Sequence, residues 1–180
     1  VAHLLRSKYD SIISTSKSIN IDNSLLNCRI KGLNNNKPNL IIIDVNLNLK
    51  KKLKLFKISQ KRKVYIFTAS KNGKKITYFK KKGIKIINID KLESKIDFLN
   101  LLKKIYKLGV NRVLVETGLT FLNKLFKYKM INDLFFFQSN EKLRNLGKNN
   151  SSNSFIKKLK LNNKINVNLK NDSLYKIRIN

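Results

Sequence analysis

The sequence predicts an α/β fold in which helices flank a largely parallel sheet. Two observations lead to this prediction. Short runs of β-branched and apolar residues at 40–44 (LIIID) and 64–68 (VYIFT) are typical of strands that are buried on both faces. Later in the chain, residues 96–108 space apolar side chains at helical intervals over the length of a crossover between parallel strands.

The chain begins with a predicted helix. Residues 1–9 have no capping residue in front of them, so we expect the natural protein to continue upstream. Residues 11–14 favour a short strand, and the Ser and Thr side chains of residues 14–23 favour a turn or one short helix. The composition of residues 34–38 (NNNKP) predicts a loop.

The remaining elements alternate between strands and helices. After the two buried strands, the sequence predicts a strand at 84–89 introduced by Gly83, a helix at 96–108 ended by Gly109, a strand at 112–116, a turn at 117–118, an amphipathic helix marked by Phe121, and a strand at 133–137. The last part of the chain differs, because residues 165–169 and 174–179 alternate apolar and polar side chains on either side of Asn171. We expect these residues to form an antiparallel hairpin at one edge of the sheet, and residues 147–154 to form a surface loop.

The formal net charge of +30 raises the possibility of a nucleic-acid-binding module. The lysines are spread along the whole chain together with Asn and Ile, a composition that AT-rich codons would produce. A dedicated binding protein more often concentrates its charge and often uses Arg. We therefore expect no nucleic-acid partner, but keep this class of function as an alternative.

Other classes of protein are disfavoured by the absence of their usual residues. Cys28 is the single cysteine, so it cannot form an internal disulfide, and a reducing compartment such as the cytoplasm is expected. The apolar runs are far shorter than the roughly 20 residues needed to cross a bilayer. We expect neither a metal site nor a membrane partner.

Several motifs, taken in order, resemble those of the reductase domain of the bifunctional riboflavin-biosynthesis deaminase/reductase. Leu4-Leu5-Arg6 and the segments at 9–13, 18–23 and 26–29 are similar to the family pattern LLR…DAILVG…TVLADDP.L..R. The strand at 40–44 is similar to a family strand that ends in Asp. Residues 113–122 (VLVETGLTFL) resemble VLVEGGPTL, and residues 130–134 (MINDL) resemble GLVDEL.

The resemblance implies a fold and an activity. The fold would be a dihydrofolate-reductase-like three-layer sandwich, with a mostly parallel mixed sheet and a C-terminal antiparallel hairpin. The activity would be NADPH-dependent reduction of the ribosyl group of 5-amino-6-(5-phosphoribosylamino)uracil to the ribityl form. Residues 1–180 would be a single reductase domain that lacks its N-terminal strand and an upstream deaminase domain, and that forms a homodimer.

The resemblance also assigns the residues of the site. Substrate would be bound by Arg6, Leu26, Arg29 and Glu116. Cofactor would be bound by Ser18, Asp22, Val45, Gly118, Leu119, Thr120, Phe121, Leu122, Asn123 and Lys124. Independent physical arguments support part of this assignment, since Arg matches phosphate oxygens in bidentate fashion and a Gly before a helix lets backbone amides approach a phosphate. We expect the ends of the strands at 40–44 and 112–116 to open side by side onto a cleft that both arginines face.

Two departures from the family pattern bear on the cofactor. Thr117 stands where the family usually has Gly, and Leu119 stands where it usually has Pro, so the geometry of the phosphate-binding turn is in question. His3, the single histidine, is expected on the surface of the first helix rather than in the chemistry. No proton donor is apparent, and a truncated reductase that folds but is inactive remains an alternative.

Overall fold

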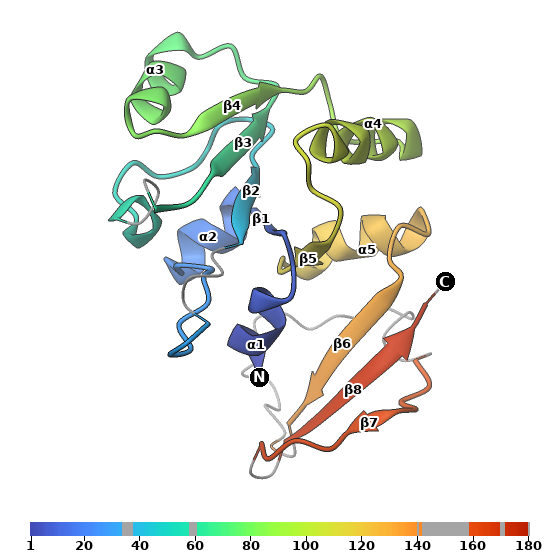
Figure 1. The fold of residues 1–180 in the computed structure, drawn as a ribbon. Coiled ribbons are helices and arrows are strands. Elements are labelled where there is room, and N and C mark those ends of the chain that lie inside the picture. Colours follow the sequence, from blue (N-terminus) through green and yellow to red (C-terminus); the bar gives the residue numbers. More distant parts are fainter. Residues whose placement is uncertain (34–37, 58–60, 140, 142–158, 170–171, 180) are drawn as a thin grey trace. The chain divides into compact units, whose positions relative to one another are not determined.

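Figure 1 shows the computed structural model of the chain, which describes residues 1–33, 38–57, 61–139, 141, 159–169 and 172–179. The loop predicted at 147–154 and most of the loop predicted at 34–38 fall outside these residues, as does Asn171 of the predicted hairpin. The chain divides into two compact units, Val1–Phe121 and Leu122–Asn180. Each unit is described by itself.

The first unit contains a five-stranded sheet in the order β4-β3-β2-β1-β5, in which all paired strands are parallel. This confirms the predicted parallel sheet. The strands are β1 (Ser11–Thr15), β2 (Asn39–Ile43), β3 (Val64–Thr68), β4 (Lys85–Asn88) and β5 (Val113–Val115).

Helices precede, connect and follow these strands, and the sequence predicts part of them. The described helices are α1 (Ala2–Ser7), α2 (Ser16–Asp22), α3 (Gly73–Lys81), α4 (Lys95–Tyr106) and α5 (Leu119–Lys127), with a short 3-10 helix η1 (Lys54–Lys57). The sequence did not predict α3 or η1. In α3 only Phe79 is buried, which leaves a weak apolar signal, although Asn72 caps its N-terminus by accepting a hydrogen bond from the amide of Lys75.

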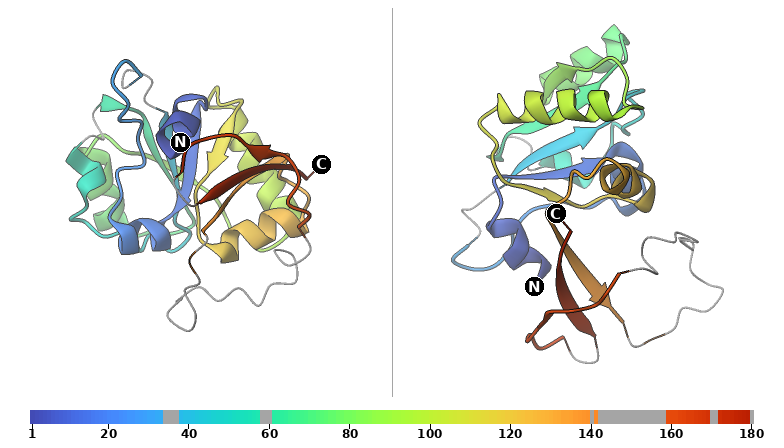
Figure 2. Two further views of the ribbon diagram at one scale, coloured as in Figure 1. Left: turned by 90° about the horizontal axis from the view of Figure 1, so that it is seen from below. Right: turned by 90° about the vertical axis from the view of Figure 1, so that its right-hand side faces the viewer.

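The sheet is covered by helices on both faces, so the first unit has three layers (Figure 1). On one face, Ile12, Leu40 and Val64 form a row across β1, β2 and β3. Ile19 of α2 and Phe79 of α3 belong to the same buried cluster. Both views of Figure 2 place α4 on the opposite face of the sheet from α3.

The second unit contains an antiparallel sheet in the order β6-β8-β7. Its strands are β6 (Asp133–Gln138), β7 (Lys164–Ile165) and β8 (Ser173–Arg178). The predicted antiparallel pairing of the two C-terminal segments is confirmed, but the first strand is shorter than residues 165–169 and instead covers 164–165. Among the described residues the pair forms this separate sheet with β6 rather than continuing the five-stranded one.

No described helix has both the length and the apolar composition that crossing a bilayer requires. Within the same residues, no group of three or more His, Cys, Asp or Glu side chains is arranged to hold a metal ion.

Candidate active site

Apart from Arg6, which lies in α1 before β1, the predicted site residues follow the carboxyl ends of three neighbouring strands. Asp44 follows β2, α2 follows β1, and Glu116 follows β5. Because the strands are parallel, these ends share one edge of the sheet, where ligands of open α/β folds bind. The ends of β2 and β5 were expected to lie side by side. The two strands are not direct neighbours, because β1 lies between them. A hollow of about 230 Å³ lies elsewhere, between the residues after β4 and helix α4, and none of the predicted site residues lines it.

Arg6 and Glu116 form a two-pronged ion pair. Arg6 Nε donates to Glu116 Oε1 at 2.8 Å, and Arg6 Nη2 donates to Oε2 at 2.7 Å. The hydrogen bonds from Arg6 to Glu116 raise the pKa of Arg6 above its ordinary value. The two side chains are only 14% and 27% exposed, so the pair is partly shielded from water. Two residues that the family resemblance assigns to substrate therefore hold each other.

The segment 25–29 lies against α1 through its backbone. The carbonyl of Asn27 accepts hydrogen bonds from Arg6 Nη1 at 3.2 Å and from His3 Nδ1 at 2.8 Å. Because Nδ1 must then carry the proton, His3 Nε2 can accept from Arg29 Nη2, which lies 3.3 Å away. His3, expected only on the helix surface, thus links α1 to Arg29.

The two residues of this segment that are predicted to bind substrate differ in exposure. Arg29 is exposed, so its guanidinium can reach a ligand. Leu26 is 6% exposed and its side chain belongs to the hydrophobic core. The backbone of Leu26 has a φ of 48°, in the left-handed region that branched side chains rarely adopt.

Ser18 and Gly118 meet although they lie far apart in the sequence. The amide of Gly118 donates to Ser18 Oγ at 3.1 Å. Ser18 is held in turn by Thr15, which caps α2 and lies 3.1 Å from Ser18 Oγ. Asp22 is exposed at the end of α2, one turn beyond Ser18 on the same face of the helix. The structure therefore brings together two of the residues predicted to bind cofactor, from the ends of β1 and β5.

The turn before α5 can accommodate the residues that depart from the family pattern. Neither Thr117 nor Gly118 has a positive φ, so Thr at 117 imposes no backbone strain. A Cβ placed on Gly118 would lie 3.7 Å from Ser18 Oγ, an ordinary contact distance. The first turn of α5 contains no acidic residue, and its amides are those that a helix leaves unpaired at its N-terminus. These features suit a phosphate group.

The predicted cofactor residues of α5 are presented differently. Leu119 is half-buried and Thr120 is exposed. Phe121 is 8% exposed and its ring packs 5.5 Å from that of Phe98, so only its backbone is available to a ligand. The remaining three residues continue the helix in the second unit; they are Leu122, Asn123 and Lys124.

Asp44 organises the end of β2. Its carboxylate is 2% exposed and accepts from Ser16 Oγ at 2.7 Å and from the amides of Asn48 and Leu49, both at 2.8 Å. The carbonyl of the next residue, Val45, accepts hydrogen bonds from the hydroxyl of Thr68, which ends β3, and from the amide of Ala69. Asp44 therefore fixes the chain after β2 against the start of α2. Because the carbonyl of Val45 is already used, a ligand would have to contact its amide or its side chain.

Comparison with known proteins places these features in a family. Residues 1–150 match the model of the RibD C-terminal domain. The riboflavin biosynthesis protein RibD of Buchnera aphidicola is 29% identical over 161 residues, which cover 80% of this chain and 41% of that protein.

Solved structures show the same fold. The deaminase/5-amino-6-(5-phosphoribosylamino)uracil reductase of Thermotoga maritima superposes with a TM-score of 0.73 at 19% identity, covering 99% of this chain and 47% of that one. The riboflavin biosynthesis reductase Rib7 of Saccharomyces cerevisiae superposes with a TM-score of 0.71 at 20% identity, covering 99% and 78%. The chain thus spans about half the length of the RibD proteins it matches. With its family model matched over most of its residues, the chain belongs to the RibD C-terminal domain family.

Proposed function

We propose that this chain is an NADPH-dependent reductase that converts the ribosyl group of 5-amino-6-(5-phosphoribosylamino)uracil to a ribityl group. The observation that carries the proposal is the Arg6–Glu116 pair, which lies two residues before Gly118 and beside the segment that bears Arg29. One relative carries the name of this reductase activity, and family membership supports the same reaction here.

On the substrate side, each residue has a distinct task. Arg29 is exposed and cationic, so it can bind the phosphate of the ribosyl group. Each oxygen of Glu116 accepts one hydrogen bond from Arg6 and keeps a further lone pair, which can accept from an N–H or O–H of the substrate. Arg6 orients the carboxylate of Glu116, and Leu26 would contribute its backbone.

On the cofactor side, Ser18, Gly118 and the first amides of α5 would hold the phosphates of NADPH. Asp22 and Val45 would border the same site, and Leu119 to Lys124 would continue it along α5. NADPH, when bound, supplies the hydride that reduces C1′ of the ring-opened ribosyl group. The protein's part is to orient the two reactants and to balance their charge.

The cellular setting follows from this chemistry. A biosynthetic reductase that uses NADPH and has a single buried thiol, Cys28, is expected in the cytoplasm. We also propose that the chain acts as a single reductase domain and that it pairs as a homodimer.

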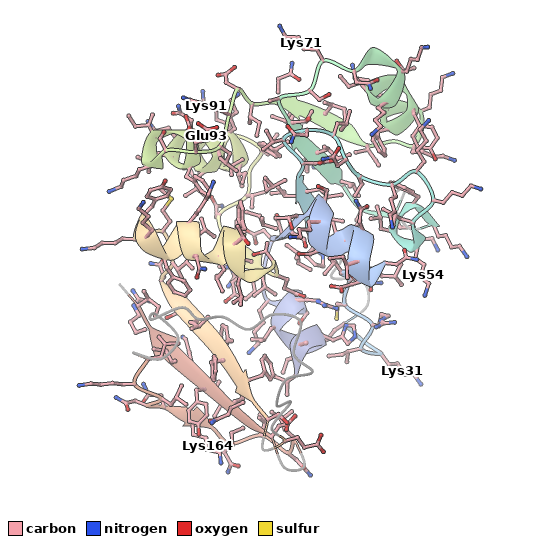
Figure 3. All side chains as sticks on the ribbon, turned by 180° about the vertical axis from the view of Figure 1, so that it is seen from behind. Lys31, Lys54, Lys71, Lys91, Glu93 and Lys164 are labelled. Atoms are coloured by element: carbon pink, nitrogen blue, oxygen red, sulfur yellow. The ribbon has the colours of Figure 1, made fainter. Side chains whose placement is uncertain are left out.

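The experiment that tests the function is oxidation of NADPH, followed by absorbance, with 5-amino-6-(5-phosphoribosylamino)uracil as substrate. Turnover by the wild-type chain that is lost in Glu116→Gln would support it. A chain that binds duplex DNA with a steep dependence on salt and has no affinity for NADPH would instead favour the nucleic-acid alternative. In Figure 3 the labelled lysines of the first unit, Lys31, Lys54, Lys71 and Lys91, project outward from four separate segments.

A further inference from the structure

Arg62 is a buried cation that no sequence motif identifies. It is 9% exposed and precedes β3. Its Nη1 donates to the carbonyls of Leu26 and Pro38, and its Nη2 donates to the carbonyl of Leu25. Within the described part of the chain, no carboxylate lies within ion-pair distance of this guanidinium.

Such a group is costly to bury. An unpaired charge loses its hydration on burial, and hydrogen bonds to carbonyls recover only part of that loss. Burial, reinforced by the nearby charge of Arg6, lowers the pKa of Arg62 to about 10. Its Nε has no hydrogen-bond partner among the described residues. An apolar side chain would avoid these costs but would leave the carbonyls of Leu25, Leu26 and Pro38 without these donors.

The guanidinium of Arg62 holds the backbone of the segment 25–29 by hydrogen bonds. Three successive carbonyls of this segment accept hydrogen bonds from side chains outside it: those of Leu25 and Leu26 from Arg62, and that of Asn27 from Arg6 and His3. The middle residue, Leu26, has a φ of 48°, in the left-handed region that is unfavourable for a residue with a Cβ. The two Nη atoms of Arg62 bind the carbonyl that precedes Leu26 and the carbonyl of Leu26 itself. These hydrogen bonds stabilise the turn at Leu26.

The same turn sets the direction of Arg29. The side chain of Leu26 is buried in the core. Arg29 comes three residues later in the sequence, and its guanidinium contacts His3. Without a fixed backbone at Leu25 and Leu26, Arg29 would not be held against His3 of α1, the helix that also carries Arg6. We propose that Arg62 is a positioning residue for substrate, which acts by holding the segment 25–29 through its carbonyls. This inference rests on the proposed reductase function.

The test uses Arg62→Met, which keeps an unbranched apolar stem and removes every donor, with Lys63→Met as the matched loss of an exposed neighbouring cation. We expect Arg62→Met to raise KM for the phosphoribosylamino-pyrimidine by about tenfold or more, as loss of hydrogen bonds from a charged group predicts. NADPH affinity should stay within about twofold of wild type, because the hydrogen bonds of Arg62 do not involve Ser18 or Gly118. Amide hydrogen exchange should accelerate within residues 25–29, and Lys63→Met should behave like the wild type.

Wild-type KM and exchange in Arg62→Met would overturn the inference. So would an equal loss of substrate and NADPH affinity, because that pattern marks a general role in folding. Should Arg62→Met fail to fold, Arg62→Lys decides: one ammonium cannot reproduce the fork, so KM should rise with NADPH affinity intact, and an unchanged KM would refute the role. If the wild-type chain binds NADPH but does not turn over, the reductase proposal fails, whereas the exchange measurement still reports whether Arg62 holds the segment.

Discussion

Arg6 and Glu116 are 110 positions apart in the sequence and are joined by two parallel hydrogen bonds of 2.8 and 2.7 Å. The pair connects α1 to the end of β5, and Arg6 also reaches the backbone of Asn27. Bidentate pairing of this kind fixes the orientation of a carboxylate as well as its charge. The site is therefore assembled by contacts among its own residues, and its members should not act independently.

The first prediction concerns this coupling. Arg6→Ala and Glu116→Ala should each lower kcat/KM by about tenfold or more, and the double variant should be little worse than either, because each substitution already breaks the pair. Steady-state kinetics of the four proteins in the cycle measure the coupling. Lys8→Ala, an exposed cation at the end of the same helix, is the control. If the loss of kcat/KM in the double variant equals the product of the two single losses, the two residues act separately.

The second prediction concerns the phosphate turn. Ser18→Ala removes the acceptor for the Gly118 amide and should weaken NADPH binding by about fivefold to tenfold, as loss of one hydrogen bond predicts, whereas Ser18→Thr should retain most of the affinity. Fluorescence titration of NADPH measures both. Lys17→Ala, an exposed neighbour on the same helix, should leave the affinity unchanged. Equal affinities for Ser18→Ala and wild type would remove Ser18 from the cofactor site.

The third prediction concerns pH. Asp10 accepts hydrogen bonds from the amides of Asn111 at 2.9 Å and Arg112 at 2.8 Å, and these bonds, the one from Arg112 foremost, lower the pKa of Asp10 below its ordinary value of 3.8. A carboxylate with a lowered pKa stabilises the fold above its unfolded pKa, and this contribution disappears as pH falls through the folded value.

Asp10→Ala should therefore lower the free energy of unfolding by about 1 kcal/mol at neutral pH, similar to the loss of a helix cap, and by progressively less below pH 3.8. Urea unfolding at several pH values measures this difference. The exposed Asp90 provides the control variant Asp90→Ala, which should cost little at any pH. A deficit in Asp10→Ala that persists undiminished in acid would mean that these amide bonds are not its source.

The fourth prediction separates packing from binding in α5. Phe121 packs against Phe98, so Phe121→Ala should lower the free energy of unfolding by about 3–5 kcal/mol. Phe121→Leu keeps most of the apolar volume and the backbone amide, so NADPH affinity should stay within about twofold of wild type. Thermal unfolding and NADPH titration of Phe121→Leu measure the two effects. Selective loss of NADPH affinity in this stable variant would place the ring itself against the cofactor.

The elements that the sequence predicts well are those with a strong local signal. The strand at 64–68 is uniformly buried and β-branched or aromatic, and the helix at 96–108 repeats its apolar residues every three or four positions. The helix α3 was missed because polar residues dominate it and tertiary contact through Phe79 determines its packing. The separate sheet of β6, β7 and β8 was also missed, since alternation of side chains predicts strands but does not identify their neighbours.

The same distinction applies to the site. Motifs predict that Ser18, Gly118 and Glu116 belong to a site, and the structure brings Ser18 to Gly118. The pairing of Glu116 with Arg6 could not be derived from the sequence, because a carboxylate in a Lys-rich chain has many possible partners. Arg62 was invisible for a related reason: its ligands are backbone carbonyls, which any sequence supplies.

The most direct test of the account is the fate of the hydride. The wild-type chain is incubated with 5-amino-6-(5-phosphoribosylamino)uracil and NADPH carrying deuterium at both hydrogens of nicotinamide C4, and the product is analysed by mass spectrometry and NMR. The account predicts one deuterium at C1′ of a ribityl product, formed by the wild type and strongly reduced in Glu116→Gln. NADPH bound by the folded chain without any deuterium reaching C1′ would contradict it.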